Sequence, residues 1–282
     1  MLGAIIGDVV GSVYEWHNIK TKEFEMFDAF CTFTDDTVMT VAVAKALCAV
    51  LETYDTDKFK EELVLQMQTF GRKYSGRGYG GKFAQWLKSA DPKPYNSFGN
   101  GSAMRVSACG YLAANIEQAL EFAKTSAEVT HNHPEGIKGA QATAAAIFLA
   151  KCGKPKAEIK QYIEENFYKL DKTLAEIRPS YRFDVTCQGS VPQAIQAFLE
   201  STDFEDAIRN AISIGGDSDT IAAIAGSIAW AYYRDFDRSL QENMRELQKK
   251  VYDYLPQEFI DIYEKTDLLR AKAESATTAF VD

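Results

Sequence analysis

Four aspartates stand in two pairs far apart in the sequence, and each pair is followed by a hydroxyl residue. One pair is Asp35 and Asp36, within T-D-D-T, and the other is Asp217 and Asp219, within G-G-D-S-D-T. Carboxylate and hydroxyl oxygens are the ligands that hard divalent cations such as Mg²⁺ and Mn²⁺ prefer. If the two pairs meet in the fold, their charges repel one another unless a cation neutralises them. The residue types therefore favour a metal centre.

Each pair begins an apolar stretch with helical spacing, over 37–52 and 219–234. The alternative is ordinary helix capping, in which Thr34 or Ser218 caps the helix and the acids face its positive end. Capping explains one carboxylate for each helix but not two, so both readings stay open at this point.

Glu15 ends the string G-D-V-V-G-S-V-Y-E and is flanked by Tyr14 and Trp16. It is either an exposed glutamate after a first helix or a further acid of the oxygen-rich site.

A glycine-rich string, G-R-G-Y-G-G-K, covers residues 76–82 and nearly spells a P-loop. The next residue is Phe83, so the hydroxyl that would bind Mg²⁺ is missing, and a helix instead of a strand precedes the string. A P-loop NTPase is thereby excluded. Either this is a flexible surface loop, or its backbone amides hold a phosphate, because glycine lets a ligand approach closely.

The string S-F-G-N-G-S over 97–102 has the same character and is expected to lead into a helix that begins near Ala103. We expect Met104 and Arg105 to pack beneath it. His131 and His133 form an H-x-H pair, which holds zinc in some hydrolases when it follows a strand. No strand precedes it here, and we expect His133 to face solvent.

The composition bounds the function. The chain has 282 residues, 46% hydrophobic content and a formal charge of −9, which argues against nucleic acid or an anionic membrane as a partner. The five cysteines form no C-x-x-C pair and are expected to be reduced, with Cys48 and Cys109 buried. No signal peptide or membrane span is apparent. We expect a cytoplasmic protein, and a monomer.

Most of the sequence shows the apolar spacing of helices, and no Pro/Gly/Ser-rich linker divides it. We predict an all-α fold, a single domain over 1–282 built as an orthogonal helical bundle. Two helices rich in small residues, over 136–151 and 219–234, are expected to lie buried at its centre. The other expected helices cover 37–52, 57–70, 117–129, 156–168, 190–200, 203–213 and 238–252.

Six strings occur in one order and together resemble the ADP-ribosylglycohydrolase family: G-D-x-x-G-S-x-Y-E, T-D-D-T, R-G-Y-G-G, F-G-N-G-S-A-M-R, T-H and G-G-D-S-D-T-I-A. The resemblance runs from residue 3 to about residue 234. It implies an all-helical fold and two Mg²⁺ or Mn²⁺ ions. The implied reaction cleaves the N- or O-glycosidic bond between ADP-ribose and a protein side chain, so the implied partner is ADP-ribose or an ADP-ribosylated protein.

The resemblance assigns roles to residues of this chain. The implied metal ligands are Thr34, Asp35, Asp36, Asp217, Asp219, Thr220 and Glu15. The implied contacts with ADP-ribose are Gly78, Gly80, Gly81, Ser97, Phe98, Gly99, Asn100, Gly101 and His131. Glu15, Asp35 or Asp36 would accept a proton during catalysis. Ser218 stands where the family usually has threonine, at a position that is not a principal ligand.

The linkage that is cleaved is a narrower question. G-S-x-Y-E and R-G-Y-G are more similar to the branch that cleaves O-linked (serine) ADP-ribose than to the arginine-specific branch. Free poly(ADP-ribose), O-acetyl-ADP-ribose and ADP-ribose-1″-phosphate stay open as substrates. The alternatives are a Mg²⁺-dependent phosphohydrolase and a catalytically silent ADP-ribose-binding protein. A silent protein is expected to have lost a ligand or Glu15, and none is missing.

Overall fold

The computed structural model describes residues 1–234 and 238–278, and this part of the chain consists of helices and connecting loops, without a strand. The all-α prediction is confirmed. The α-helices are α1 (Leu2–Gly11), α2 (Asp35–Val50), α3 (Thr56–Lys73), α4 (Gly81–Lys88), α5 (Ser107–Leu112), α6 (Ile116–Glu128), α7 (Pro134–Lys151), α8 (Lys156–Asn166), α9 (Leu174–Ile177), α10 (Cys187–Leu199), α11 (Phe204–Ser213), α12 (Ser218–Tyr233), α13 (Arg238–Tyr252) and α14 (Gln257–Thr278). Two short 3₁₀ turns, η1 (Leu51–Thr53) and η2 (Asn100–Ser102), complete the set.

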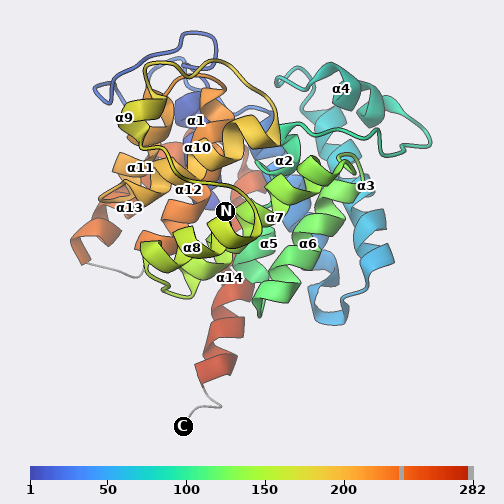
Figure 1. Ribbon diagram of the computed structural model, residues 1–282. Helices are drawn as coiled ribbons and strands as arrows, with labels where there is room; N and C mark the ends of the chain where they lie inside the picture. The colour runs from blue at the N-terminus through green and yellow to red at the C-terminus, as the bar shows by residue number, and fades with distance from the viewer. Residues whose placement is uncertain (235–237, 279–282) are drawn as a thin grey trace.

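The interior is formed by helices rich in small residues, as the sequence predicts. Every residue of α12 except Tyr232 is buried, and α7 packs against it. Outer helices surround this interior, and the C-terminal part of α14 extends away from the bundle at the bottom of the view (Figure 1). Buried helices of this kind show no polar stripe, because neighbours cover all their faces.

Helix α1 also lies in the interior, where glycines allow it to touch α12. A Cβ atom on Gly3 would lie 2.1 Å from the Gly226 carbonyl oxygen, and a Cβ atom on Gly7 would lie 2.1 Å from the Ala222 carbonyl oxygen. One on Gly11 would lie 2.6 Å from the Cα atom of Asp219. The three glycines are four residues apart, so they share one helix face. This contact holds the end of α1 beside the acidic start of α12.

We expect Gly7→Ala to destabilise the protein by at least about 2 kcal/mol, because the added methyl group meets backbone atoms that cannot move without displacing a helix. Gly81→Ala is the matched control, because a Cβ atom there meets nothing within 4 Å. Urea unfolding of both variants measures the difference. A Gly7→Ala protein as stable as the control would contradict the close approach.

Some local expectations are wrong. The helix expected near Ala103 begins only at Ser107, because η2 comes first and the Asn100 carbonyl oxygen accepts the Ala103 and Met104 amides. Cys109 is buried as expected, but Cys48 is only half-buried. The helix that begins at Ser107 is α5, and its six residues are all buried, so they offer no polar–apolar period that would mark its start. Helices α4, α9 and α14 are not among the expected ones.

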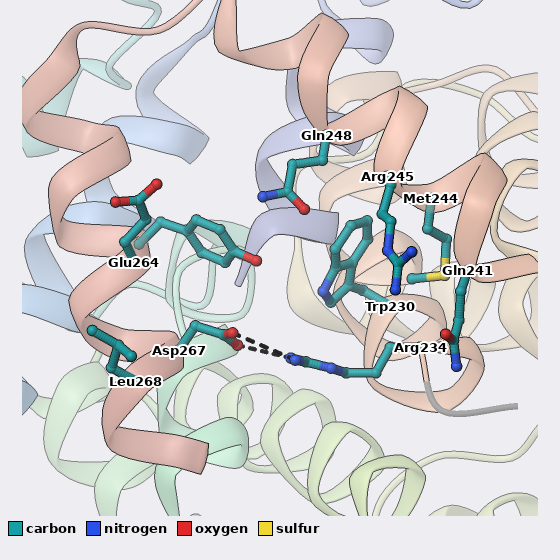
Figure 2. Close-up of a pocket in the computed structure, with 10 residues that line it drawn as sticks. Trp230, Arg234, Gln241, Met244, Arg245, Gln248, Glu264, Asp267 and Leu268 are labelled. Carbon is teal, nitrogen blue, oxygen red and sulfur yellow. Dashed lines mark hydrogen bonds and ion pairs between the residues drawn. The ribbon is translucent and has the colours of Figure 1, made fainter. Parts of the chain in front are cut away.

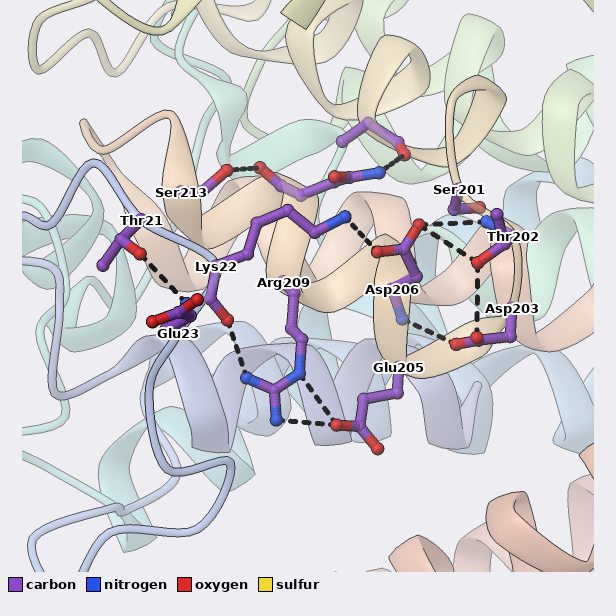
Figure 3. Close-up of polar contacts among 12 residues, drawn as sticks. Thr21, Lys22, Glu23, Ser201, Thr202, Asp203, Glu205, Asp206, Arg209 and Ser213 are labelled. Atoms are coloured by element: carbon purple, nitrogen blue, oxygen red, sulfur yellow. Dashed lines mark hydrogen bonds and ion pairs between the residues drawn. The ribbon is translucent and has the colours of Figure 1, made fainter.

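The loop after α1 is fixed to helix α11 by polar contacts (Figure 3). The Arg209 guanidinium donates to the carbonyl oxygens of Lys22 and Phe24, both at 2.8 Å, and pairs with Glu205 on its own helix. The Lys22 ammonium pairs with Asp206. The loop between Glu15 and α2 is therefore anchored to α11.

At the other end of α12, Arg234 pairs with Asp267 of α14 at 2.7 Å. This ion pair lines a cavity of about 480 Å³ among α12, α13 and α14, and none of the predicted site residues lies in its wall (Figure 2). Within the described residues, we find no helix whose length and apolar character would let it span a bilayer.

Candidate functional site

Nearly all the residues predicted to bind ligands line one pocket of about 360 Å³. The predicted residues in its wall are Glu15, Asp35, Asp36, Gly78, Gly80, Gly81, Ser97, Gly99, Asn100, Gly101, His131, Asp217, Asp219 and Thr220. They come from segments that are up to about 200 residues apart in the sequence. Thr34 and Phe98 are the two predicted residues that the wall does not include.

The first acidic pair begins α2 and is braced from behind by Asp8 of α1. The buried Asp8 carboxylate accepts hydrogen bonds from the Thr34 hydroxyl at 2.6 Å and from the backbone amides of Thr34 and Thr37 at 2.9 and 3.0 Å. Thr34 is the N-cap of α2 and accepts the Asp36 amide. Asp8 thus fixes the start of the helix and leaves the carboxylates of Asp35 and Asp36 to the pocket.

The second acidic pair begins α12. The Asp217 carboxylate accepts a hydrogen bond of 2.6 Å from the Asn100 side-chain amide, which also donates to the Ser190 hydroxyl. The Thr220 hydroxyl donates to Asp36 of the other pair at 3.2 Å. The two pairs therefore converge. The capping reading holds for Thr34, but Ser218 does not cap α12, because Asp217 is the N-cap residue, without a side-chain capping hydrogen bond, and Ser218 is the first residue of the helix.

The meeting of these carboxylates produces two clusters suited to a cation. Oxygens of Asp8, Asp36 and Asp219 lie within 4.8 Å of one another, and so do oxygens of Glu15, Asp217 and Asp219. Asp219 belongs to both clusters.

Burial is the largest cause of the raised pKa values of Asp35, Asp36 and Asp219, and neighbouring carboxylates add to it. Burial also raises the pKa of Asp217 to about 6. One oxygen of Asp36, Oδ1, is buried and has no hydrogen-bond partner in the part of the chain that the structure describes. An all-oxygen donor set with an unpartnered buried carboxylate oxygen fits one or two hard divalent cations.

Glu15 lies on the turn after α1, at the edge of the second cluster. Asn18 holds this turn against the start of α12, since its side-chain amide donates to the carbonyl oxygens of Glu15 and Gly216 at 2.9 Å. Burial, with Asp219 and Asp8 nearby, raises the pKa of Glu15 to about 7, although a hydrogen bond with Trp16 acts against this. Glu15 is therefore half-buried beside the acidic pairs, so the first of the two sequence readings does not describe it.

The glycine-rich loop at 76–80 leads to the N-terminus of α4, at the pocket wall. Gly78 has φ +102°, and a Cβ atom there would lie 3.0 Å from an Asp35 carboxylate oxygen, so glycine is required twice over. Arg77 ties the loop to α2, because its carbonyl oxygen accepts the Asp35 amide at 2.8 Å. Gly80 is the N-cap residue of α4, and no side chain bonds the first amides of this helix. Amides at such a helix start favour an anion.

The loop at 97–101 also lines the pocket and is paired with the segment before α10. The Asn100 amide donates to the Val185 carbonyl oxygen at 2.8 Å, and the Gly99 amide donates to the Ser97 hydroxyl at 3.2 Å. These two amides are already used, so the open backbone cradle that the sequence suggested is only part of this wall. The side chain of Asn100 supports Asp217, which the sequence did not indicate.

The two histidines differ in their surroundings. His131 is buried, and its Nδ1 lies 2.7 Å from the Thr130 hydroxyl. Burial, with Arg105 nearby, lowers its pKa well below the usual value. His133 is half-buried and caps α7 by accepting the Glu135 amide, so the expectation that it faces solvent is wrong. Phe98 is 44% exposed, and the centroid of its ring lies 5.3 Å from the centroid of the His133 ring.

Several residues of the site were missed by sequence reasoning: Asp8, Asn18, Lys82, Phe183 and Val185. Met104 and Arg105 were expected to pack beneath the loop, and both are buried, but they also line the pocket. A polar residue within the apolar run of α1 was a signal for Asp8. The others carry no pattern that marks them.

Comparisons with known proteins agree with the resemblance. A family model described as ADP-ribosylglycohydrolase matches residues 1–271. The chain is 29% identical to a human protein named ADP-ribosylhydrolase ARH3, over 83% of this chain and 84% of that protein. It is 25% identical to ADP-ribosylarginine hydrolase Tri1 of Pseudomonas putida (strain GB-1), over 83% of this chain and 69% of that protein. A solved structure titled "ADP-ribosylglycohydrolase-related protein complex" has the same fold, with a TM-score of 0.60 at 22% identity over 90% of this chain and 95% of that one.

Proposed function

The chain belongs to the ADP-ribosylglycohydrolase family, and from this premise we propose that its pocket cleaves the glycosidic bond between ADP-ribose and a protein side chain with the help of two divalent cations. The chain is a hydrolase that acts on glycosyl bonds of ADP-ribose. What we propose is the dependence on metal ions, the identity of the glycosidic bond that is cleaved, and the roles of the individual residues. The observation that carries it is the convergence of two acidic pairs and Glu15 in one pocket.

The residues that would hold the cations are Thr34, Asp35, Asp36, Asp217, Asp219, Thr220 and Glu15. Asp219 belongs to both clusters, so two neighbouring cations could share it as a ligand. When bound, the cations would supply positive charge that neutralises the carboxylates and polarises oxygen atoms of the distal ribose and of water. Asp8 and Asn100 keep the ligands in place, because each is hydrogen-bonded to one of them.

The chain's own groups divide the remaining work. Glu15 is half-buried at the edge of the acidic cluster and lines the pocket, which suits a residue that takes a proton from an attacking water. Asp35 and Asp36 are the other candidates for that role. The start of α4 and the loop at 97–101 would bind the phosphates and the ribose next to them, because both line the pocket beside the acids. Phe98 is exposed at the rim and would contact adenine or ribose only if the ligand extends beyond the pocket wall.

The bond that we favour is the O-glycosidic bond to serine. The strings G-S-x-Y-E and R-G-Y-G support this choice by their resemblance to the O-linked branch. The protein named as an ADP-ribosylarginine hydrolase also shares fewer identities with this chain than the human ARH3 protein does, 25% against 29%.

A product analysis tests the proposal. Peptides that carry ADP-ribose on serine or on arginine are incubated with the protein and Mg²⁺, and the products are separated and identified by mass spectrometry. We expect free ADP-ribose and an unmodified peptide, formed faster from the serine peptide. Release of inorganic phosphate would show the alternative phosphohydrolase. Binding of ADP-ribose without any product would show the silent binding protein.

A further inference from the structure

Arg105 is a buried arginine beneath the pocket that no carboxylate neutralises among the described residues. Its side chain is 1% exposed, and its Nη2 donates to the Ser126 carbonyl oxygen at 2.6 Å and to the Thr130 hydroxyl at 2.8 Å. Its Nε has no hydrogen-bond partner within residues 1–234 and 238–278. Burial lowers the pKa of Arg105 to about 10, so the group is still charged at neutral pH. A buried charge without a counter-charge is costly, which points to an anion that arrives with the ligand.

Thr130 connects Arg105 to His131. The Thr130 oxygen accepts from Arg105, which can only donate, and it also lies 2.7 Å from Nδ1 of His131. Thr130 is fully buried. If Nδ1 carried the proton, the threonine oxygen would accept twice, and its own proton would be buried without an acceptor. That loss costs about 1–3 kcal/mol. The threonine therefore donates to Nδ1, and the proton of the neutral imidazole is on Nε2.

Nε2 of His131 lies at the glycines of the 97–101 loop. A Cβ atom on Gly101 would lie 3.2 Å from Nε2, and one on Gly99 would lie 3.5 Å from it. Nε2 has no hydrogen-bond partner among the described residues. Lys82 and Arg105 are the cationic side chains in the pocket wall, and Lys82 is exposed. The buried positive charge of this wall thus stands directly behind His131.

We propose that Arg105, acting through Thr130, holds His131 as a neutral imidazole with its proton on Nε2, where it donates a hydrogen bond to a phosphate oxygen of the ADP-ribosyl ligand. Arg105 and Thr130 are positioning residues, and His131 is the group that touches the ligand. The identity of the ligand rests on the proposed function, whereas the tautomer is a property of the protein alone.

The tautomer is measured first, by ¹⁵N NMR of the imidazole in the protein without ADP-ribose. His17→Asn and His133→Asn leave His131 as the single histidine. In this background we expect the pattern of an Nε2–H imidazole. Thr130→Val removes the donor to Nδ1, so the Nδ1 resonance should move toward that of a ring nitrogen without a hydrogen bond, and Thr130→Ser should restore the original pattern. Thr143→Val is the matched control, because the Thr143 hydroxyl is also buried but has no partner.

Binding is measured next, by calorimetry with ADP-ribose and with adenosine, both in the presence of Mg²⁺. Thr130→Val should weaken ADP-ribose binding at least about tenfold, the loss of one hydrogen bond to a charged group. Adenosine lacks phosphate, so its affinity should not change. Arg105→Gln should give the same losses. If it does not fold, Thr130→Val decides alone.

The inference would be overturned if His131 carries its proton on Nδ1, or carries two protons, while Arg105 and Thr130 are unsubstituted. A Thr130→Val protein that binds ADP-ribose normally would overturn it as well. If the parent protein neither binds ADP-ribose nor releases it from peptides, the proposed function fails instead. The NMR result would still decide on the tautomer, so the two failures are distinguishable.

Discussion

Asp219→Asn is expected to abolish metal binding and to lower kcat by at least about 10³-fold, because the cations supply several kcal/mol of charge stabilisation and each 1.4 kcal/mol is a factor of ten. Asp219 is the one residue that both acidic clusters share. The asparagine keeps the size of the side chain and can still accept the Thr220 amide, as Asp219 does at 2.9 Å. Metal analysis and turnover of the purified variant measure the two losses.

The same variant should be no less stable than the wild type when both are free of metal, because one of several repelling carboxylates has lost its charge. Thermal unfolding in EDTA measures this. Asp171→Asn is the matched control, since Asp171 is exposed and away from the pocket. If Asp219→Asn binds two cations and turns over like the control, the acidic clusters are not the metal site.

Glu15→Gln has the second largest expected effect. Glutamine keeps the size and the hydrogen bonding of the side chain but cannot take a proton, and such groups contribute about 10²–10⁴-fold to catalysis. We expect a variant that folds normally, binds ADP-ribose, and loses at least about 10²-fold in kcat. Steady-state kinetics at saturating Mg²⁺, with calorimetry for binding, separate the two properties.

Glu23→Gln is the control for this variant, because Glu23 is exposed on the same loop. Its kcat should match that of the wild type, and its free energy of unfolding should differ by no more than about 0.5 kcal/mol. If Glu15→Gln turns over at nearly the rate of the wild type, Glu15 does not take the proton. Asp35 or Asp36 would then have that role.

The sequence predicted the fold class from local patterns, whereas the meeting of the acidic pairs stayed open on spacing alone and followed from the resemblance to the family. An apolar small-residue stretch after each pair indicates a buried helix, and a buried helix start brings its acids into the interior. Thr34 as N-cap follows from the same rule and is observed. The spacing of Gly3, Gly7 and Gly11 was also readable as a close approach of two helices, but it does not say which helix is approached.

Partners and side-chain directions could not be predicted in this way. Asp8 is distinguishable only as an interruption of an apolar run until the structure places α1 beside the start of α2. The Asn100 side chain was assigned to ligand, but its hydrogen bonds go to Asp217 and Ser190, more than 80 residues away. Phe98 was expected at the ligand, and its ring lies outside the wall because the 97–101 loop pairs with the segment at 185–187. Such contacts depend on tertiary structure, which no local pattern records.

The central claim is that the converging carboxylates work through bound cations, and a metal titration of the metal-free protein tests it most directly. The protein is stripped with EDTA and dialysed, and release of ADP-ribose from a serine-linked peptide is followed as Mg²⁺ or Mn²⁺ is added. We expect no turnover without metal, and full turnover once two cations are bound to each chain. Full turnover by protein shown to be free of metal would contradict the claim.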